Sequence, residues 1–94
     1  MSDSAMHVDP KSLREFADEL ANTATDYKKY IESLDASLAR LGSSWRDQEF
    51  AAFSTEVKKT QRVLEQFVHE AAVARRVLLE DADRAEAYQR ISRS

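Results

Sequence analysis

The chain has 94 residues, of which 43% are hydrophobic and 33% are charged, and its formal net charge is −3. Its length limits it to one domain, over residues 1–94, and its apolar content argues against a disordered chain. One Gly, one Pro and no Cys exclude a disulfide scaffold, a thiolate metal site and a sheet built on many tight turns. No apolar run reaches the length of about 18 residues that a membrane-spanning helix needs. The acidic start lacks the basic and apolar pattern of a signal peptide.

The first predicted helix covers residues 10–41. Asp9 and Pro10 form its start signal, because Asp accepts hydrogen bonds from first-turn amides and Pro is tolerated at the first helical position. We expect residues 1–8 to fray, since they are polar and aperiodic. Apolar residues then recur every seven positions, which is typical of an amphipathic helix. This row consists of Leu13, Leu20, Tyr27, Leu34 and Leu41.

The sequence predicts a turn at residues 42–44 and a second helix over residues 45–91. Gly42 is the sole Gly and follows the last periodic residue, where a left-handed helix cap belongs. Ser44 and Asp47 then resemble a capping box for the next helix. The second apolar stripe has the period of coiled-coil packing, with two polar members. It contains Phe50, Phe53, Val57, Thr60, Leu64, Phe67, Ala71, Ala74, Leu78, Asp81, Ala85 and Tyr88.

Two such helices, roughly 48 and 69 Å long at 1.5 Å per residue, form an antiparallel hairpin around a short turn. A turn centred at 43–44 sets residue i opposite a residue near 87 − i, so Pro10 is expected to face Val77. Residues 78–91 would then overhang the first helix, and four apolar residues of the overhang would lack a partner within the hairpin. These are Leu78, Ala85, Tyr88 and Ile91.

A two-helix hairpin buries only one side of each stripe, and half-burial returns about half of the 1.5–3 kcal/mol that a fully buried Leu or Phe contributes. Ordering each residue costs about 1–2 kcal/mol of backbone entropy. We therefore predict an all-α fold: an antiparallel helical hairpin that forms a four-helix bundle on dimerisation. The partner is the chain itself or a related helical-hairpin protein, and the sequence leaves homodimer and heterodimer open.

Catalytic and ligand-binding chemistry is not indicated by the sequence. His7 falls in the polar tail and His69 on a predicted solvent face, so no metal-ligand spacing is formed. The carboxylates and the basic groups around Lys58 and Arg75 are typical of solvated helix faces. We expect no enzyme activity, cofactor or metal. The net charge has the wrong sign for nucleic acid, and we do not expect a membrane partner.

Trp45, the sole Trp, lies directly after the predicted turn, and two roles are open for it. It is either a bulky side chain that closes the end of the bundle or an aromatic anchor for a partner.

This pattern resembles the WXG (ESAT-like) small proteins of type VII secretion. Their pattern is a Leu-rich helix, a turn, Trp-Xaa-Gly and an apolar residue eight positions after the Trp. Here Leu38 and Leu41 precede Trp45, and Phe53 follows it, whereas Asp47 stands at the Gly position. The family's export signal, a Tyr followed four residues later by Asp or Glu, is also absent, because Tyr88 is followed by Ser92 at that distance.

The resemblance implies a non-enzymatic dimeric protein that is a type VII secretion substrate, or the partner or targeting chaperone of one. A larger secreted cargo and a secretion ATPase are its further implied partners. We expect a cytoplasmic stage before export, and export without a cleaved signal peptide. Two alternatives stay open: a coiled-coil adaptor unrelated to secretion, and a hairpin that binds at a membrane interface.

We assign the predicted contacts to two sets of residues. The turn-recognition set is Trp45, Asp47 and Phe50. The partner-interface set is Leu20, Tyr27, Leu34, Phe53, Leu64, Phe67 and Leu78.

Overall fold

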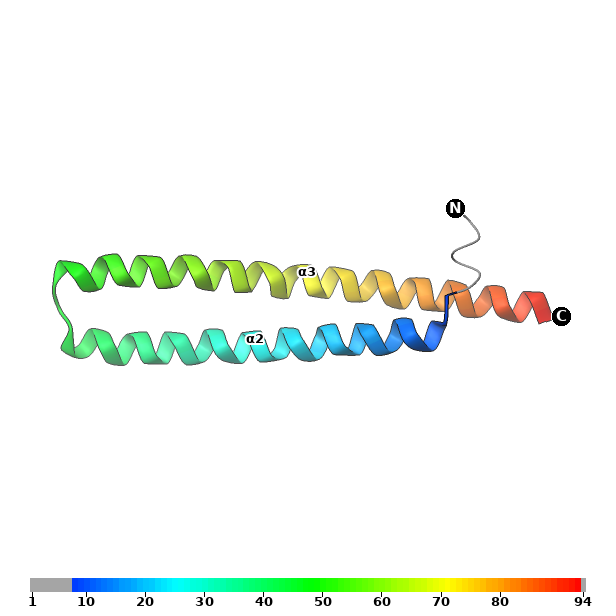
Figure 1. Ribbon diagram of the computed structural model, residues 1–94, viewed down its shortest axis with the longest axis horizontal. Coiled ribbons are helices and arrows are strands. Elements are labelled where there is room, and N and C mark those ends of the chain that lie inside the picture. Colours follow the sequence, from blue (N-terminus) through cyan, green and yellow to red (C-terminus); the bar gives the residue numbers. More distant parts are fainter. Residues whose placement is uncertain (1–7, 94) are drawn as a thin grey trace. The chain divides into compact units, whose positions relative to one another are not determined.

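The computed structural model describes the backbone of residues 8–93 and the side chains of residues 8–92. The described chain is all-helical: α2 (Pro10–Ser44) and α3 (Gln48–Arg93) are joined by a short linker, Trp45–Asp47 (Figure 1). Helix contacts divide the chain into two compact units. We call Ala24–Glu70 the turn unit, and the described part of Met1–Thr23 with Ala71–Ser94 the terminal unit. His7 lies outside the described residues.

Helix α2 begins where the Asp9–Pro10 pair predicts. Asp9 Oδ1 accepts a hydrogen bond from the Lys11 amide at 3.1 Å, and Asp9 Oδ2 accepts one from Ser12 Oγ at 3.0 Å. The bond from Lys11 satisfies one of the backbone amides that have no carbonyl partner in the first turn of a helix. Pro10 is the first helical residue and is buried, so its ring contributes to the core as well as to the helix start.

The linker lies about one helical turn later than the predicted 42–44. Helix α2 continues through Gly42, and no described residue has a positive φ, so the predicted left-handed cap at Gly42 is wrong. Ser43 Oγ donates to the Arg40 carbonyl at 2.7 Å, and Ser44 Oγ donates to the Leu41 carbonyl at 3.2 Å. The Trp45 amide also donates to the Leu41 carbonyl at 2.9 Å, so helical hydrogen bonding continues past Gly42 to the end of α2.

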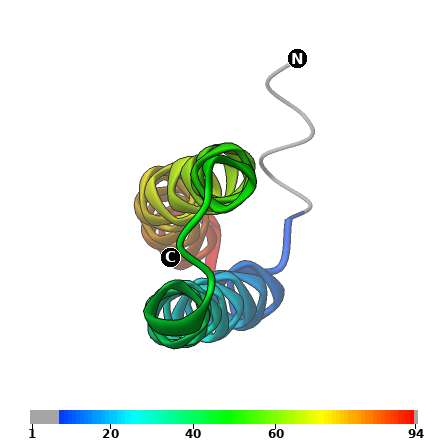
Figure 2. The same ribbon diagram turned by 90° about the vertical axis from the view of Figure 1, so that its left-hand side faces the viewer.

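Asp47, rather than Ser44, caps the start of helix α3. Asp47 Oδ1 accepts a hydrogen bond from the Phe50 amide at 3.2 Å, the bond of a helix N-cap to the third helical residue. Glu49 adds a second carboxylate within the first turn, where the helix dipole favours negative charge. Figure 2 shows the hairpin from the end that carries the linker, of which Asp47 is the last residue.

In the terminal unit the two helices meet through small side chains. The buried apolar residues here are Pro10, Ala17, Ala71, Ala82 and Ala85. Arg75 Nε is also buried, without a hydrogen-bond partner among the described residues. The leucines of this unit, Leu13, Leu20, Leu78 and Leu79, are half-buried, so only the small side chains are fully enclosed.

An ion-pair cluster shows that the register of the terminal unit differs from the predicted one. Arg14 Nη2 lies 3.0 Å from Asp83 Oδ1 and 2.6 Å from Glu86 Oε2, whereas the 87 − i rule sets residue 14 opposite residue 73. A turn centred on Arg46 instead sets residue i opposite residue 92 − i. This accounts for about half of the difference between the predicted partner of Arg14 and the observed ones. The hydrogen bonds that Arg14 donates to the carboxylates of Glu86 and Asp83 raise the pKa of Arg14.

The later register shortens the overhang. Ala85 is buried and Leu78 is half-buried, so the prediction that both lack a partner within the hairpin is wrong. Tyr88 and Ile91 are exposed. Burial of α3 therefore extends at least to Ala85.

In the turn unit the residue buried between the helices is Gln61, and not its neighbour Thr60 as the apolar stripe predicts. Thr60 was a predicted stripe member, but it is exposed and Gln61 is 5% exposed. Gln61 Nε2 donates to Asp35 Oδ1 at 2.7 Å and to the Ile31 carbonyl at 3.3 Å. Val57, Gln61, Leu64 and Val68 alternate at four and three residues, and all are buried or half-buried. Val57 and Leu64 therefore face inward as predicted, whereas Gln61 replaces Thr60 and Val68 was not predicted. We call these four residues the inner stripe.

Gln61 substitutions test whether this polar contact stabilises the turn unit. We expect Gln61→Leu to be close to wild type, because Asp35 is exposed and can rehydrate. Gln61→Ala should lower the free energy of unfolding by about 1 kcal/mol, because its hydrogen bonds are lost. Gln61→Glu should lower it further, because the new carboxylate faces Asp35 and the Ile31 carbonyl. Since protonation neutralises the new Glu, the Gln61→Glu deficit should shrink as the pH falls. Thermal unfolding by circular dichroism at neutral and acidic pH measures this. Equal losses for Ala and Glu at neutral pH would contradict the assignment.

Candidate partner-binding site

Three aromatic rings gather at the turn. The Trp45 ring centroid lies 5.6 Å from that of Phe50 and 5.6 Å from that of Phe53, at interplanar angles of 62° and 39°. Both distances and tilts are favourable for aromatic pairs. Phe50 and Phe53 project from the first turns of α3, three residues apart, and Trp45 comes from the linker. Phe53 is exposed while Trp45 and Phe50 are half-buried, so the cluster is part core and part surface.

Gly42 provides the space into which Phe50 packs. A Cβ at residue 42 would lie 2.8 Å from Phe50 Cζ and 3.1 Å from Cε1, which is closer than side chains tolerate. The single Gly of the chain therefore allows close approach of a ring to the last turns of α2. Nothing in its backbone conformation requires Gly.

Asp47 has a different role from its aromatic neighbours. Its carboxylate caps α3 through the Phe50 amide, and the side chain is exposed. The predicted turn-recognition set is thus split: Trp45 and Phe50 pack together, and Asp47 fixes the helix that carries Phe50. Their role in recognition stays a prediction.

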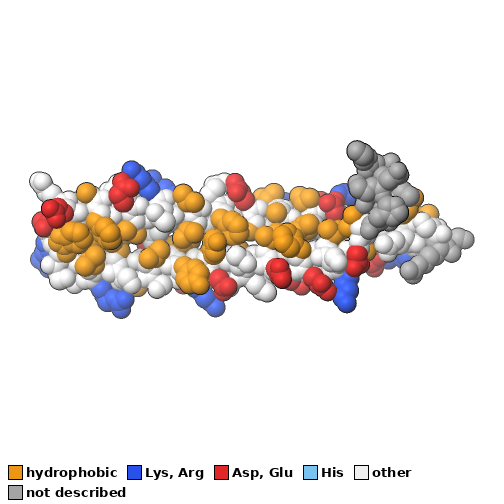
Figure 3. Space-filling view, viewed as in Figure 1, with side chains coloured by type: hydrophobic (Ala, Val, Ile, Leu, Met, Phe, Trp, Pro, Cys, Tyr) orange, Lys and Arg blue, Asp and Glu red, His pale blue; other side chains and the backbone are white. Residues whose placement is uncertain are grey.

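A second aromatic contact lies further along the turn unit. The Tyr27 ring lies 4.7 Å from Phe67 across the two helices and 6.5 Å from Tyr30 on its own helix. Leu34 follows Tyr27 by seven residues and therefore lies on the same side of α2. Tyr30 is 61% exposed and Leu34 is 39% exposed. We call the group of Tyr27, Tyr30, Leu34, Phe53 and Phe67 the aromatic face. Figure 3 shows that hydrophobic side chains gather near the turn and where the helices meet.

The predicted partner-interface residues divide between surface and core. Tyr27, Leu34, Phe53 and Phe67 belong to the aromatic face. Leu64 is half-buried in the inner stripe of the turn unit, and Leu20 and Leu78 are half-buried in the terminal unit. Across the described residues no large side chain is fully buried. The surface that a partner could still cover is therefore large in both units.

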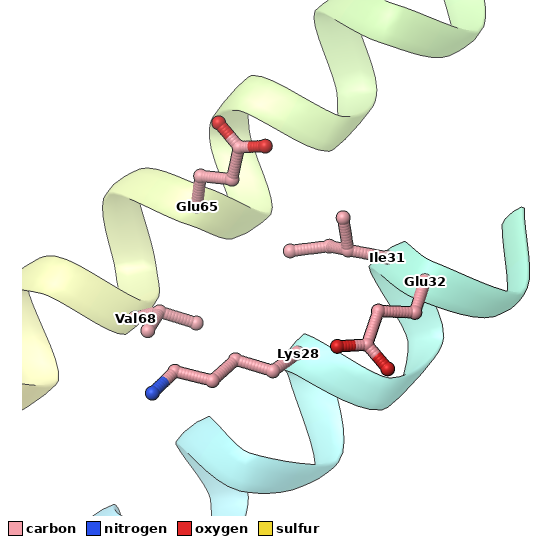
Figure 4. A pocket seen from close by; sticks show the side chains of 5 residues that line it. All are labelled: Lys28, Ile31, Glu32, Glu65 and Val68. Carbon is pink, nitrogen blue, oxygen red and sulfur yellow. The ribbon is translucent and has the colours of Figure 1, made fainter. Parts of the chain in front are cut away.

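A shallow groove, not anticipated from the sequence, lies between the helices of the turn unit. Its volume is about 280 Å³ and it is lined by Lys28, Ile31, Glu32, Glu65 and Val68. Figure 4 shows Ile31 and Val68 directed into the space between the helices, with charged groups around them. The groove can hold one small apolar group. Its mixed charges do not define a ligand.

Two further features were considered in the described residues: a metal site and a membrane-spanning helix. No group of three or more His, Asp or Glu side chains there is arranged to hold a metal ion, and His69 is exposed as predicted. None of the described helices has a window that is long and apolar enough to cross a membrane.

Sequence reasoning missed the structural roles of three residues, Gln61, Gly42 and Arg14. Counting four and three residues from Val57 identifies Gln61 as part of an inner stripe, but its polarity concealed it among apolar neighbours. Gly42 was assigned to a cap because it ends the periodic row. Arg14 gave no local signal, because its partners are distant in the sequence.

Comparison with models of protein families gives a match over most of the chain. The family model described as WXG100, proteins of 100 residues with WXG, matches residues 5–89. No curated protein and no solved structure matches the chain. The match spans both helices and the linker with its aromatic cluster.

A double-mutant cycle tests the packing of Phe50 on Gly42. In a Phe50→Ala background, Gly42→Ala should stabilise the protein by about 1 kcal/mol, the helix-propensity difference between the two residues. In the wild-type background the added Cβ displaces the Phe50 ring, so we expect that gain to be lost and Trp45 fluorescence to change. Urea unfolding of the four proteins gives the coupling. An equal gain in both backgrounds would show that Phe50 does not pack on Gly42.

Proposed function

We propose that this chain, which belongs to the WXG100 family, acts by binding another helical hairpin through its aromatic face to form a four-helix bundle. The chain is a small helical-hairpin protein of the type VII secretion kind, and members of its family are non-enzymatic, secreted helical proteins. Within that frame, we propose that it is a secretion substrate or the escort of one.

The observation that supports binding is the composition of the core. The buried apolar side chains are mostly alanines, while Tyr30, Leu34 and Phe53 are exposed in the turn unit. Exposed large hydrophobic residues that share one face mark an interaction surface. A partner hairpin would cover them and supply the missing layer of the bundle.

The turn cluster supports a recognition step after assembly. Trp45 is held against Phe50 and Phe53, with Phe53 exposed, so a partner's tail or the secretion machinery can contact a preformed aromatic surface. The chain lacks an acidic residue four positions after Tyr88. We therefore propose that the partner or a larger cargo provides the tail signal, and that a secretion ATPase reads it together with this turn.

Export tests the recognition role of Trp45. We expect the wild-type chain in the culture supernatant of its own cells with its N-terminus uncleaved. Trp45→Ala should reduce export at least several-fold, because the anchor ring is lost, whereas Trp45→Phe should retain most of it. Immunoblots of supernatant and cells, with circular dichroism of the purified variants as a folding control, measure this. Wild-type export of Trp45→Ala would remove Trp45 from recognition.

Association in cells tests the aromatic face. Tyr30→Ser with Leu34→Ser should shift the chain in cell extracts from complex to free size, because both side chains lose contact with the partner. Val73→Ser with Val77→Ser is the matched control. Val73 is 42% exposed and Val77 is 48% exposed, so they resemble the tested pair in exposure. They lie on the outer side of α3, because Val73 is two residues from buried Ala71 and Val77 is one residue from half-buried Leu78. Gel filtration with immunoblotting reports the sizes. An equal response of both double variants would contradict binding through this face.

A further inference from the structure

One edge of α3 in the turn unit alternates carboxylates with apolar side chains. Positions that alternate at four and three residues lie in one stripe along a helix. Such a stripe runs through Glu49, Phe53, Glu56, Thr60, Val63, Phe67 and Glu70. Every member is exposed except Phe67, which is half-buried. We call it the acidic edge.

The acidic edge borders the aromatic face. Phe67 contacts Tyr27 of α2, and Phe53 contacts Trp45, so the edge shares two residues with that face. The inner stripe lies between the acidic edge and the groove, which Val68 of that stripe lines together with Glu65. Any chain that covers the aromatic face therefore meets Glu49, Glu56 and Glu70.

The chain offers few cations to neutralise this edge. Glu56 lies 3.1 Å from Lys59 on its own helix, and both side chains are more than half exposed. Glu70 accepts a hydrogen bond from Gln66, which is uncharged. Glu49 interacts with the start of its own helix. No described ion pair joins the acidic edge to α2.

The corresponding edge of α2 does not complement these glutamates. The same spacing from Tyr30 gives Asp26, Ser33, Ser37 and Arg40. Arg40 is the single cation of this edge, and its Nη2 donates to Ser37 Oγ at 3.1 Å. A second copy of the chain would therefore bring three carboxylates against an acidic or a nearly neutral edge, whichever of its helices lay beside α3.

We propose that the aromatic face binds a different chain, a helical hairpin whose apolar stripe is flanked at seven-residue spacing by Lys or Arg. Flanking charges select partners and register where helices pack side by side, and like charges disfavour the wrong pair. The proposal rests on the proposed function, since it specifies which partner covers the face. The three glutamates disfavour self-association and attract the basic partner.

Charge substitutions in the full chain test the proposal. Light scattering at low salt, where exposed charges are least screened, should give a monomer for the wild type. Glu49→Gln with Glu56→Gln and Glu70→Gln should self-associate at least tenfold more tightly. The control removes three carboxylates elsewhere, by Glu15→Gln, Glu32→Gln and Glu65→Gln, and should leave the chain monomeric with the same change in net charge.

A charge-reversed copy serves as a probe of the partner's chemistry. Glu49→Lys with Glu56→Lys and Glu70→Lys should form a one-to-one complex with the wild type, which weakens as salt is added. A wild-type homodimer as tight as that of the Gln variant overturns the proposal, and so does a Gln variant that stays monomeric. If that homodimer is broken by Tyr30→Ser with Leu34→Ser, the proposed function still holds and only the choice of partner fails.

Discussion

The geometry of two packed helices limits what this chain can bury. Each helix turns one side toward the other, and in the terminal unit that side carries Ala17, Ala71, Ala82 and Ala85. In the turn unit it carries a buried glutamine, while Tyr30, Leu34 and Phe53 stay exposed. Small residues allow the helices to approach closely but return little hydrophobic free energy. The exposed large apolar side chains are the ones that the proposed partner would cover.

Register links the interior of the hairpin to its exposed surface. The Asp47 cap fixes where α3 begins, and Gly42 admits the Phe50 ring against the end of α2. Gln61 then joins α3 to Asp35 and the Ile31 carbonyl. With these contacts set, Phe67 meets Tyr27, and the glutamates of α3 border the aromatic face. A slip along the helices would remove these contacts together.

Much of the fold could be predicted from the sequence because its signals are local and periodic. One Gly and one Pro force long helices, seven-residue spacing identifies their apolar sides, and Asp9 with Pro10 marks the first start. The turn lies later than the sequence predicts because α2 continues to Ser44, past the last residue of its periodic row, and apolar spacing alone does not show this. That error propagated to the register, as Arg14 shows. Thr60 and Gln61 are both polar neighbours in an apolar stripe, and only the packed helices decide which of them is buried.

Hydrogen exchange on the purified chain tests the central claim, that this core is too small to be stable without a partner. At a concentration where the chain is monomeric, we expect amides in both units to exchange with opening free energies well below the roughly 5 kcal/mol at the lower end for folded domains. Protection in both units should then rise when the partner is bound. A monomer whose amides in both units are protected by about 5 kcal/mol or more would contradict the claim.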